Sequence, residues 1–209
     1  MKTQINALTE TEISLRLSEF FDKETVKRDY NPRYPPEFFN EYPRNAAVLI
    51  PILKQDHKWH ILFTRRTSSL PEHSGQVAFP GGRADPGDDS PEITALREAQ
   101  EEINLSPSDV RILGRLREIR TISNYCVIPL VGRIPWPYEF KLAREEVSRV
   151  FSIPLEWLAD LKNHYIQFRE LPSPHSPVQV IYFNHFDDEL LWGISAEITL
   201  NFLESLQLI

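Results

Sequence analysis

Cysteine is nearly absent from this chain of 209 residues, and long apolar stretches are absent altogether. The single cysteine, Cys126, excludes an intramolecular disulfide and a cysteine-rich zinc site. No segment approaches the ~18 consecutive apolar residues of a membrane-spanning helix, and the first residues lack the apolar run of a signal peptide. We therefore expect a protein of the cytoplasm that does not bind membranes.

Positive charge is also in short supply. Lysine and arginine together number 23 against 30 aspartates and glutamates, which gives a net charge of −7. This balance provides no basic surface for general nucleic-acid binding. An acidic protein that handles phosphates must place positive charge locally, through metal ions or a few arginines. The 41% hydrophobic content is enough for the core of one domain with an added arm.

The N-terminal part is expected to form a helical arm. Thr9, with a glutamate three residues later, is typical of a helix start, and an apolar stripe predicts a helix over residues 9–29. A proline-rich connector at residues 31–36 excludes both helix and central strand. We expect residues 1–44 to be this arm and residues 45–209 to be the main domain. The sequence leaves open whether the arm only packs on the domain or joins two copies in a homodimer.

The main domain alternates apolar strands with amphipathic helices. Residues 46–53 and 59–66 predict a β-hairpin. Further strands are expected at residues 77–79, 110–118, 126–134, 165–169 and 178–183, and helices at residues 91–103, 155–161 and 194–206. This order predicts an α/β fold in which a mixed sheet lies between helical layers.

A helix between Ser90 and Asn104 carries the strongest chemical signal. Ser90 before a proline is a typical N-cap, and asparagine is, after glycine, the residue best suited to a left-handed C-cap. At the helical spacing, Glu98, Glu101 and Glu102 share one side, opposite an apolar side. Such like charges repel one another, and the helix dipole disfavours anions near this end. A divalent cation would remove both penalties, because hard cations bind clustered carboxylate oxygens.

Four of the seven glycines, Gly75, Gly81, Gly82 and Gly87, lie within thirteen residues just before this helix. Glycine lets the backbone approach a metal ion or a phosphate closely. A loop of this kind that leads into three aligned carboxylates predicts a metal site for a phosphate-containing substrate.

This pattern resembles the Nudix box, in which a glycine, a glutamate and the motif Arg-Glu-aliphatic-any-Glu-Glu-any-Gly stand at fixed spacing. Here it stands as Gly82, six residues, Asp89, seven residues, and then Arg97-Glu98-Ala99-Gln100-Glu101-Glu102-Ile103-Asn104-Leu105. The departures are one extra loop residue, Asp89 for the first glutamate, Ala99 for the aliphatic residue and Asn104 for the last glycine. None of them removes a carboxylate of the helix.

The resemblance implies a Nudix-type α/β/α sandwich and a diphosphatase that hydrolyses a nucleoside diphosphate linked to another moiety. It also implies Mg²⁺ or Mn²⁺ as the cofactor. Glu98 and Glu102 correspond to the main metal ligands, Glu101 to a third, and the carbonyl of Gly82 to a further one. Arg97 corresponds to the residue that orients a carboxylate of the box.

A second pattern resembles the signature that precedes the box in coenzyme A diphosphatases (CoA pyrophosphatases). That signature has an arginine followed, several residues on, by a glycine and by Phe-Pro-Gly-Gly. The residues expected on this basis at a CoA-like substrate are Arg65, Arg66, Gly75, Phe79 and Gly81. The resemblance implies cleavage of coenzyme A or its derivatives to 3′,5′-ADP and (acyl-)phosphopantetheine.

Two points remain open from the sequence. Pro71 stands where the signature has its middle arginine, so ADP-ribose or another dinucleotide is an alternative substrate, and a non-catalytic nucleotide-binding module is a further alternative. The general base is Glu98 or Glu146, since either carboxylate could activate water.

Overall fold

The computed structural model describes residues 2–24, 36–39, 41–68, 74–171, 175 and 177–209. Eight strands form one sheet in which β1 and β7 run parallel and all other neighbours are antiparallel. The strands are β1 (Arg44–Gln55), β2 (Lys58–Arg66), β3 (Val77–Ala78), β4 (Gly81–Arg83), β5 (Arg111–Arg115), β6 (Ile119–Arg120), β7 (Tyr125–Arg133) and β8 (Val147–Pro154). The predicted mixed sheet is confirmed.

The predicted hairpin is formed by β1 and β2, which pair from Ile52–Ile61 to Gln55–Lys58. The two residues between the strands, Asp56 and His57, have φ angles of 48° and 63°. Two successive left-handed residues match the right-handed twist of the strands and close the hairpin tightly. The turn forms without glycine because aspartate and histidine are among the non-glycine residues that adopt this conformation most often.

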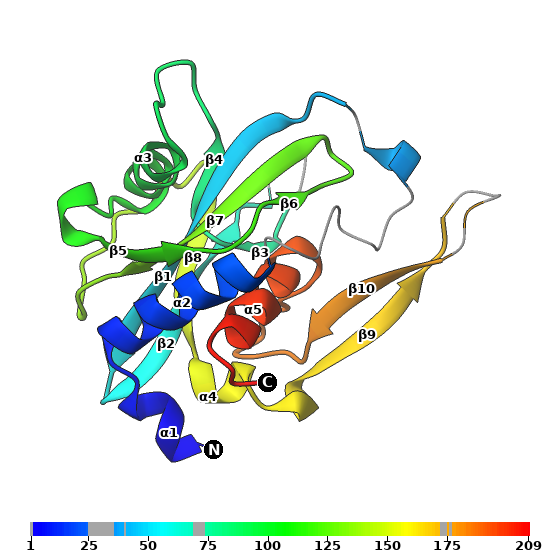
Figure 1. Cartoon of the computed structure of the whole chain (residues 1–209). Helices are drawn as coiled ribbons and strands as arrows, with labels where there is room; N and C mark the ends of the chain where they lie inside the picture. The colour runs from blue at the N-terminus through cyan, green and yellow to red at the C-terminus, as the bar shows by residue number, and fades with distance from the viewer. Residues whose placement is uncertain (1, 25–35, 40, 69–73, 172–174, 176) are drawn as a thin grey trace.

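Helices cover both faces of the sheet (Figure 1). Helix α3 (Pro91–Ile103) packs on β1, and its buried alanines, Ala95 and Ala99, share an apolar cluster with Leu49 of β1 and Leu62 of β2. On the other face, α2 (Glu10–Glu24) and α5 (Gly193–Ser205) pack over the larger apolar cluster. The predicted α/β/α sandwich is therefore confirmed, and the carboxylates of α3 lie on the face of the sheet that α3 covers.

The N-terminal helices contribute to the core of the molecule. Thr9 and Glu12 cap α2 reciprocally, since Glu12 Oε2 accepts from the Thr9 N–H at 2.7 Å and Thr9 Oγ1 accepts from the Glu12 N–H at 3.2 Å. Ile13 and Leu17 are fully buried in the cluster that also holds α5. Residues 25–29 of the predicted helix and most of the proline-rich connector lie outside the described residues. The division of the chain at residue 44 stays a prediction.

Several short elements complete the fold. They are the helices α1 (Lys2–Ala7) and α4 (Leu155–Leu158) and the 3₁₀ turns η1 (Pro36–Phe38), η2 (Pro107–Asp109) and η3 (Leu161–Asn163). A separate two-stranded sheet is formed by β9 (His164–Arg169) and β10 (Val178–Phe183). Of these, α1 was not predicted, nor were β4, β6 and β8 in the main sheet. Among the described residues, no helix is long and apolar enough to cross a membrane.

Candidate active site

Helix α3 begins and ends where its sequence predicts. Ser90 is the N-cap, and its hydroxyl accepts a hydrogen bond from the Ile93 N–H at 3.3 Å. Asn104 is the C-cap in the left-handed conformation, with φ 56° and ψ 34°. Two N–H groups of the loop between β7 and β8, those of Lys141 and Ala143, donate to the carbonyls of Ile103 and Glu102 at the end of the helix. These bonds fix the loop that carries Glu146 against the acidic end of α3.

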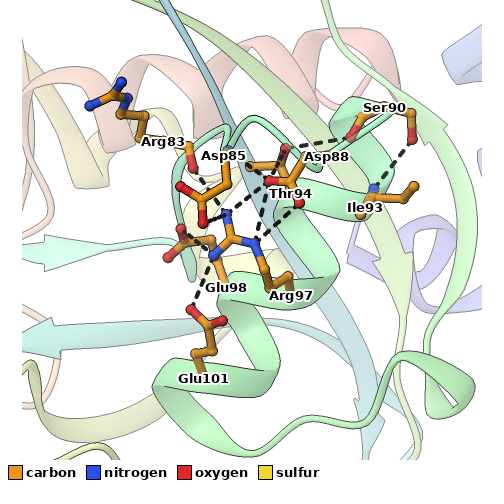
Figure 2. A network of polar contacts seen from close by, with 9 residues as sticks. All are labelled: Arg83, Asp85, Asp88, Ser90, Ile93, Thr94, Arg97, Glu98 and Glu101. Atoms are coloured by element: carbon orange, nitrogen blue, oxygen red, sulfur yellow. Dashed lines mark hydrogen bonds and ion pairs between the residues drawn. The ribbon is translucent and has the colours of Figure 1, made fainter.

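Arg97 is the hub of a polar network at the start of the site (Figure 2). Its Nη2 donates to Asp88 Oδ2 at 2.9 Å and to the carbonyl of Arg83 at 3.0 Å. Its Nη1 donates to Glu98 Oε1 at 2.9 Å and to Glu101 Oε2 at 3.0 Å. The guanidinium therefore joins the glycine loop to two carboxylates of the helix, and these contacts raise the pKa of Arg97.

The loop carboxylate of this network is Asp88, whereas the sequence comparison had aligned Asp89 with the box. The side chain of Asp88 is 5% exposed and also accepts from the Asp85 N–H and the Thr94 hydroxyl, each at 3.0 Å. The hydrogen bond from Arg97, the largest influence, lowers the pKa of Asp88 to about 2. Asp89 is exposed. The contact with Arg97 is therefore made by Asp88 and not by Asp89, the residue that the resemblance to the box had suggested.

Replacing Asp88 by asparagine is expected to lower the melting temperature. The pKa of Asp88 is depressed in the folded protein, so its stabilisation is complete above its ordinary value of 3.8 and is lost as the pH falls through about 2. The difference in unfolding free energy between wild type and Asp88→Asn should thus be constant near neutral pH and vanish in acid. Calorimetry over this range tests it, with the exposed Asp89→Asn as the matched control. An equal loss in both variants would contradict the assignment.

Two adjacent glycines bring the backbone close to the helix carboxylates. Gly81 has φ 153°, and a Cβ there would collide with the carbonyl oxygen of Ala47. A Cβ on Gly82 would lie 2.5–2.6 Å from the carboxylate atoms of Glu98. The fold therefore requires glycine at Gly81, whereas a side chain at Gly82 would displace the carboxylate of Glu98. The arrangement places the Gly82 backbone beside Glu98, as expected for two groups that share a ligand.

Glu102 is the most unusual carboxylate of the site. Its side chain is 4% exposed, and Oε2 is buried without a hydrogen-bond partner. Burial is the main cause that raises its pKa to about 8; the nearby charges of Glu98 and Glu146 raise it further, while Arg66 and the N–H of Gly81 act in the opposite direction. A buried carboxylate oxygen without a partner is costly unless a ligand completes it.

The three helix glutamates are not gathered around one point. Among the described residues, no group of three or more histidine, cysteine, aspartate or glutamate side chains is arranged to hold a metal ion. Arg97 bonds both Glu98 and Glu101, and Glu101 is exposed. The donor set nevertheless fits a hard divalent cation. Burial raises the pKa of Glu98, and Glu101 and Glu146 add repulsion that a cation would relieve.

The residues that the sequence predicts at the substrate have different surroundings in the structure. The positive charge of Arg66 is close enough to Glu102 to lower the pKa of that carboxyl. Arg65 has another partner, since its Nη1 lies 3.4 Å from Oε1 of the buried Glu189. Phe79 is 3% exposed and packs on Phe63 at 4.9 Å between ring centroids. Its side chain therefore anchors the turn before Gly81 in the core, and the structure does not place it on the surface.

The last predicted substrate residue, Gly75, has φ 67°, and its N–H donates to the carbonyl of Thr67 at 3.3 Å. A glycine is favoured there because the left-handed conformation costs it nothing. Pro71, on which the choice of substrate depended, lies outside the described residues.

Comparison with known proteins identifies the family of this chain. The family model described as NUDIX domain matches residues 43–172. Nudix hydrolase NudL of Photorhabdus laumondii is 39% identical over 78% of this chain and 86% of its own length. NudL of Yersinia pestis is 38% identical over 87% of this chain and 90% of its own. Among solved structures, a MutT/nudix family protein from Enterococcus faecalis covers 93% of this chain and 72% of its own, with 15% identity and a TM-score of 0.49. On the family model and the two NudL relatives, this chain belongs to the Nudix family of hydrolases.

Proposed function

We propose that this Nudix hydrolase cleaves the diphosphate of coenzyme A or its derivatives in the cytoplasm, with Mg²⁺ or Mn²⁺ as cofactor. The products are 3′,5′-ADP and (acyl-)phosphopantetheine. The observation that carries the metal-dependent chemistry is Glu102, a buried carboxylate with one oxygen left without a partner and with other carboxylates beside it. A divalent cation held here would satisfy this oxygen and compensate the repulsion between the carboxylates.

Glu98, Glu102 and the carbonyl of Gly82 would hold the metal in this proposal. Glu101 would be a weaker ligand, because its carboxylate is 60% exposed, against 17% for that of Glu98. A divalent ion bound by these residues would supply charge neutralisation at the diphosphate and would favour attack by water. Arg97 is a positioning residue, since its bonds to Asp88 and Glu98 fix the glycine loop and the first ligand in one geometry.

Glu146 is the proposed general base. It is exposed, and its charge is close enough to raise the pKa of both Glu98 and Glu102. A carboxylate at this place can take a proton from water that attacks the diphosphate. Glu98 is less suited to the same role because Arg97 holds one of its oxygens at 2.9 Å.

The CoA assignment depends on the residues before the box. Arg66 supplies positive charge next to the helix carboxylates, where a diphosphate would need it. Arg65 forms an ion pair with Glu189 instead, so fewer cationic side chains are left to bind the 3′-phosphate of coenzyme A. ADP-ribose or another dinucleotide is therefore the alternative substrate, and a non-catalytic module would bind nucleotide without turnover.

A comparison of initial rates tests the substrate. We expect wild-type protein with Mn²⁺ to release 3′,5′-ADP from coenzyme A, and to cleave 3′-dephospho-CoA and ADP-ribose more slowly. Products are identified by mass after chromatography, with the Glu102→Gln variant as the control for contaminating hydrolases. A preference for ADP-ribose would contradict the CoA assignment, and tight nucleotide binding without any turnover would favour the non-catalytic module.

A further inference from the structure

The β9–β10 hairpin leaves one edge strand unprotected. Strand β10 carries Ile181 and Phe183 into the core next to α5, so β9 forms the outer edge (Figure 1). In the part of the chain that the structure describes, β9 pairs with β10 alone. All residues of β9 after His164 are exposed. An edge of this kind presents free N–H and C=O groups that can pair with another strand.

The exposed strand is also apolar. Ile166 is 53% exposed and Phe168 is 68% exposed, and their spacing of two places them on the same face of the strand. Edge strands usually carry charge or proline to prevent pairing. In β9 the first charged residue after the apolar pair is Arg169, at the very end. The composition therefore favours association through this edge.

We propose that β9 pairs antiparallel with β9 of a second copy of this chain, about a two-fold axis at Gln167. In this register, Ile166 of each copy lies opposite Phe168 of the other, which makes two apolar pairs on one face. Tyr165 lies opposite Arg169, and His164 lies opposite the exposed Glu170. Cross-strand pairs of an aromatic with a β-branched residue, and of complementary polar groups, stabilise a sheet.

Neighbouring registers lose this match. An axis at Ile166 would put Phe168 opposite His164, and an axis at Phe168 would put Ile166 opposite Glu170. A strand that complements its own reversed sequence selects a second copy of itself as partner, because a two-fold interface uses the same patch twice. The other candidate for joining two copies, the N-terminal arm, already buries Ile13 and Leu17 inside its own chain.

Sedimentation analysis of the full chain tests the interface. We expect wild-type protein to form dimers and Phe168→Glu to raise the dimer dissociation constant by at least about ten-fold, since two cross-strand pairs are lost at once. The matched control is Leu161→Glu, because Leu161 is 66% exposed but lies before the strand. A monomeric wild type, or a dimer that Phe168→Glu leaves intact, would overturn the proposal.

A disulfide test fixes the register. Gln167 of the two copies would lie directly opposite each other, at a Cα separation of roughly 4.5–5.5 Å that a disulfide can span. Oxidised Gln167→Cys should therefore give a covalent dimer. Arg169→Cys, two positions from the axis, should not, and Cys126 is buried. Equal cross-linking of both variants would overturn the axis at Gln167.

Discussion

Replacing Glu102 by glutamine is expected to make the metal-free protein more heat-stable while removing its hydrolytic activity. The two effects have one cause, since the negative charge that would bind the metal is also costly to bury. The pKa of Glu102 rises from 4.5 to about 8 in the folded protein. Between these values the unfolded chain releases this proton and the folded chain retains it, so the carboxylate progressively destabilises the fold as the pH rises.

Glutamine keeps the shape of the side chain and cannot ionise. In the presence of a chelator near neutral pH, we expect Glu102→Gln to melt above wild type by several degrees, since about 1 kcal/mol corresponds to roughly 2–4 °C in a domain of this size. Below the ordinary pKa of 4.5 the difference should vanish, because the carboxyl is then protonated in both states. Added Mn²⁺ should raise the melting temperature of wild type and leave the variant nearly unchanged.

The rate of hydrolysis should fall by on the order of 10²-fold or more in Glu102→Gln, as for other groups that stabilise charge in a transition state. The matched control is Glu101→Gln, one position away and exposed, whose ion pair with Arg97 adds little to stability. We expect its melting temperature to match that of wild type. A Glu102→Gln variant that hydrolyses at the wild-type rate, or one that melts below wild type without metal, would contradict the role of Glu102.

The second large effect is expected at Gly82. In Gly82→Ala, the new Cβ would lie 2.5–2.6 Å from the carboxylate of Glu98, so this carboxylate must move. The group that moves is the end of a flexible side chain, and the fold should therefore lose little stability. A displaced metal ligand should lower kcat by roughly 10- to 100-fold, because catalysis depends on placement to within an ångström.

Gly87→Ala is the matched control for this prediction. Gly87 lies in the same loop, and a Cβ there would meet nothing within 4 Å. Its kcat and its melting temperature should equal those of wild type. If Gly82→Ala retained the full rate, the carboxylate of Glu98 would not need its present position.

Local signals in the sequence predicted α3 completely, because its start and its stop are set by neighbouring residues. Ser90 and Asn104 cap the helix as expected, and the spacing of its glutamates follows from the helical repeat. The spacing of the Nudix box leaves two aspartates open, because seven residues separate Asp89 from Arg97, whereas five residues separate Gly82 from Asp88. Only tertiary contacts decide which of two adjacent aspartates turns toward the guanidinium.

Other features depend on contacts between distant segments. Strand β8 was not predicted, since the paired glutamates before it, Glu145 and Glu146, are also compatible with the start of a helix. Its alternate residues Val147, Phe151 and Ile153 are buried, and pairing with β2 decides its conformation. Arg65 and Arg66 were grouped in the sequence, but successive residues of a strand point to opposite faces, and their partners in the structure differ.

Release of 3′,5′-ADP from coenzyme A by wild-type protein, followed as Mn²⁺ is added to the chelator-treated enzyme, is the most direct measurement. We predict no release without metal, a rate that rises and saturates with Mn²⁺, and no such rise in the Glu102→Gln variant. Release that is equal with and without metal, or a full rate in Glu102→Gln, would contradict a metal-dependent diphosphatase built on this helix.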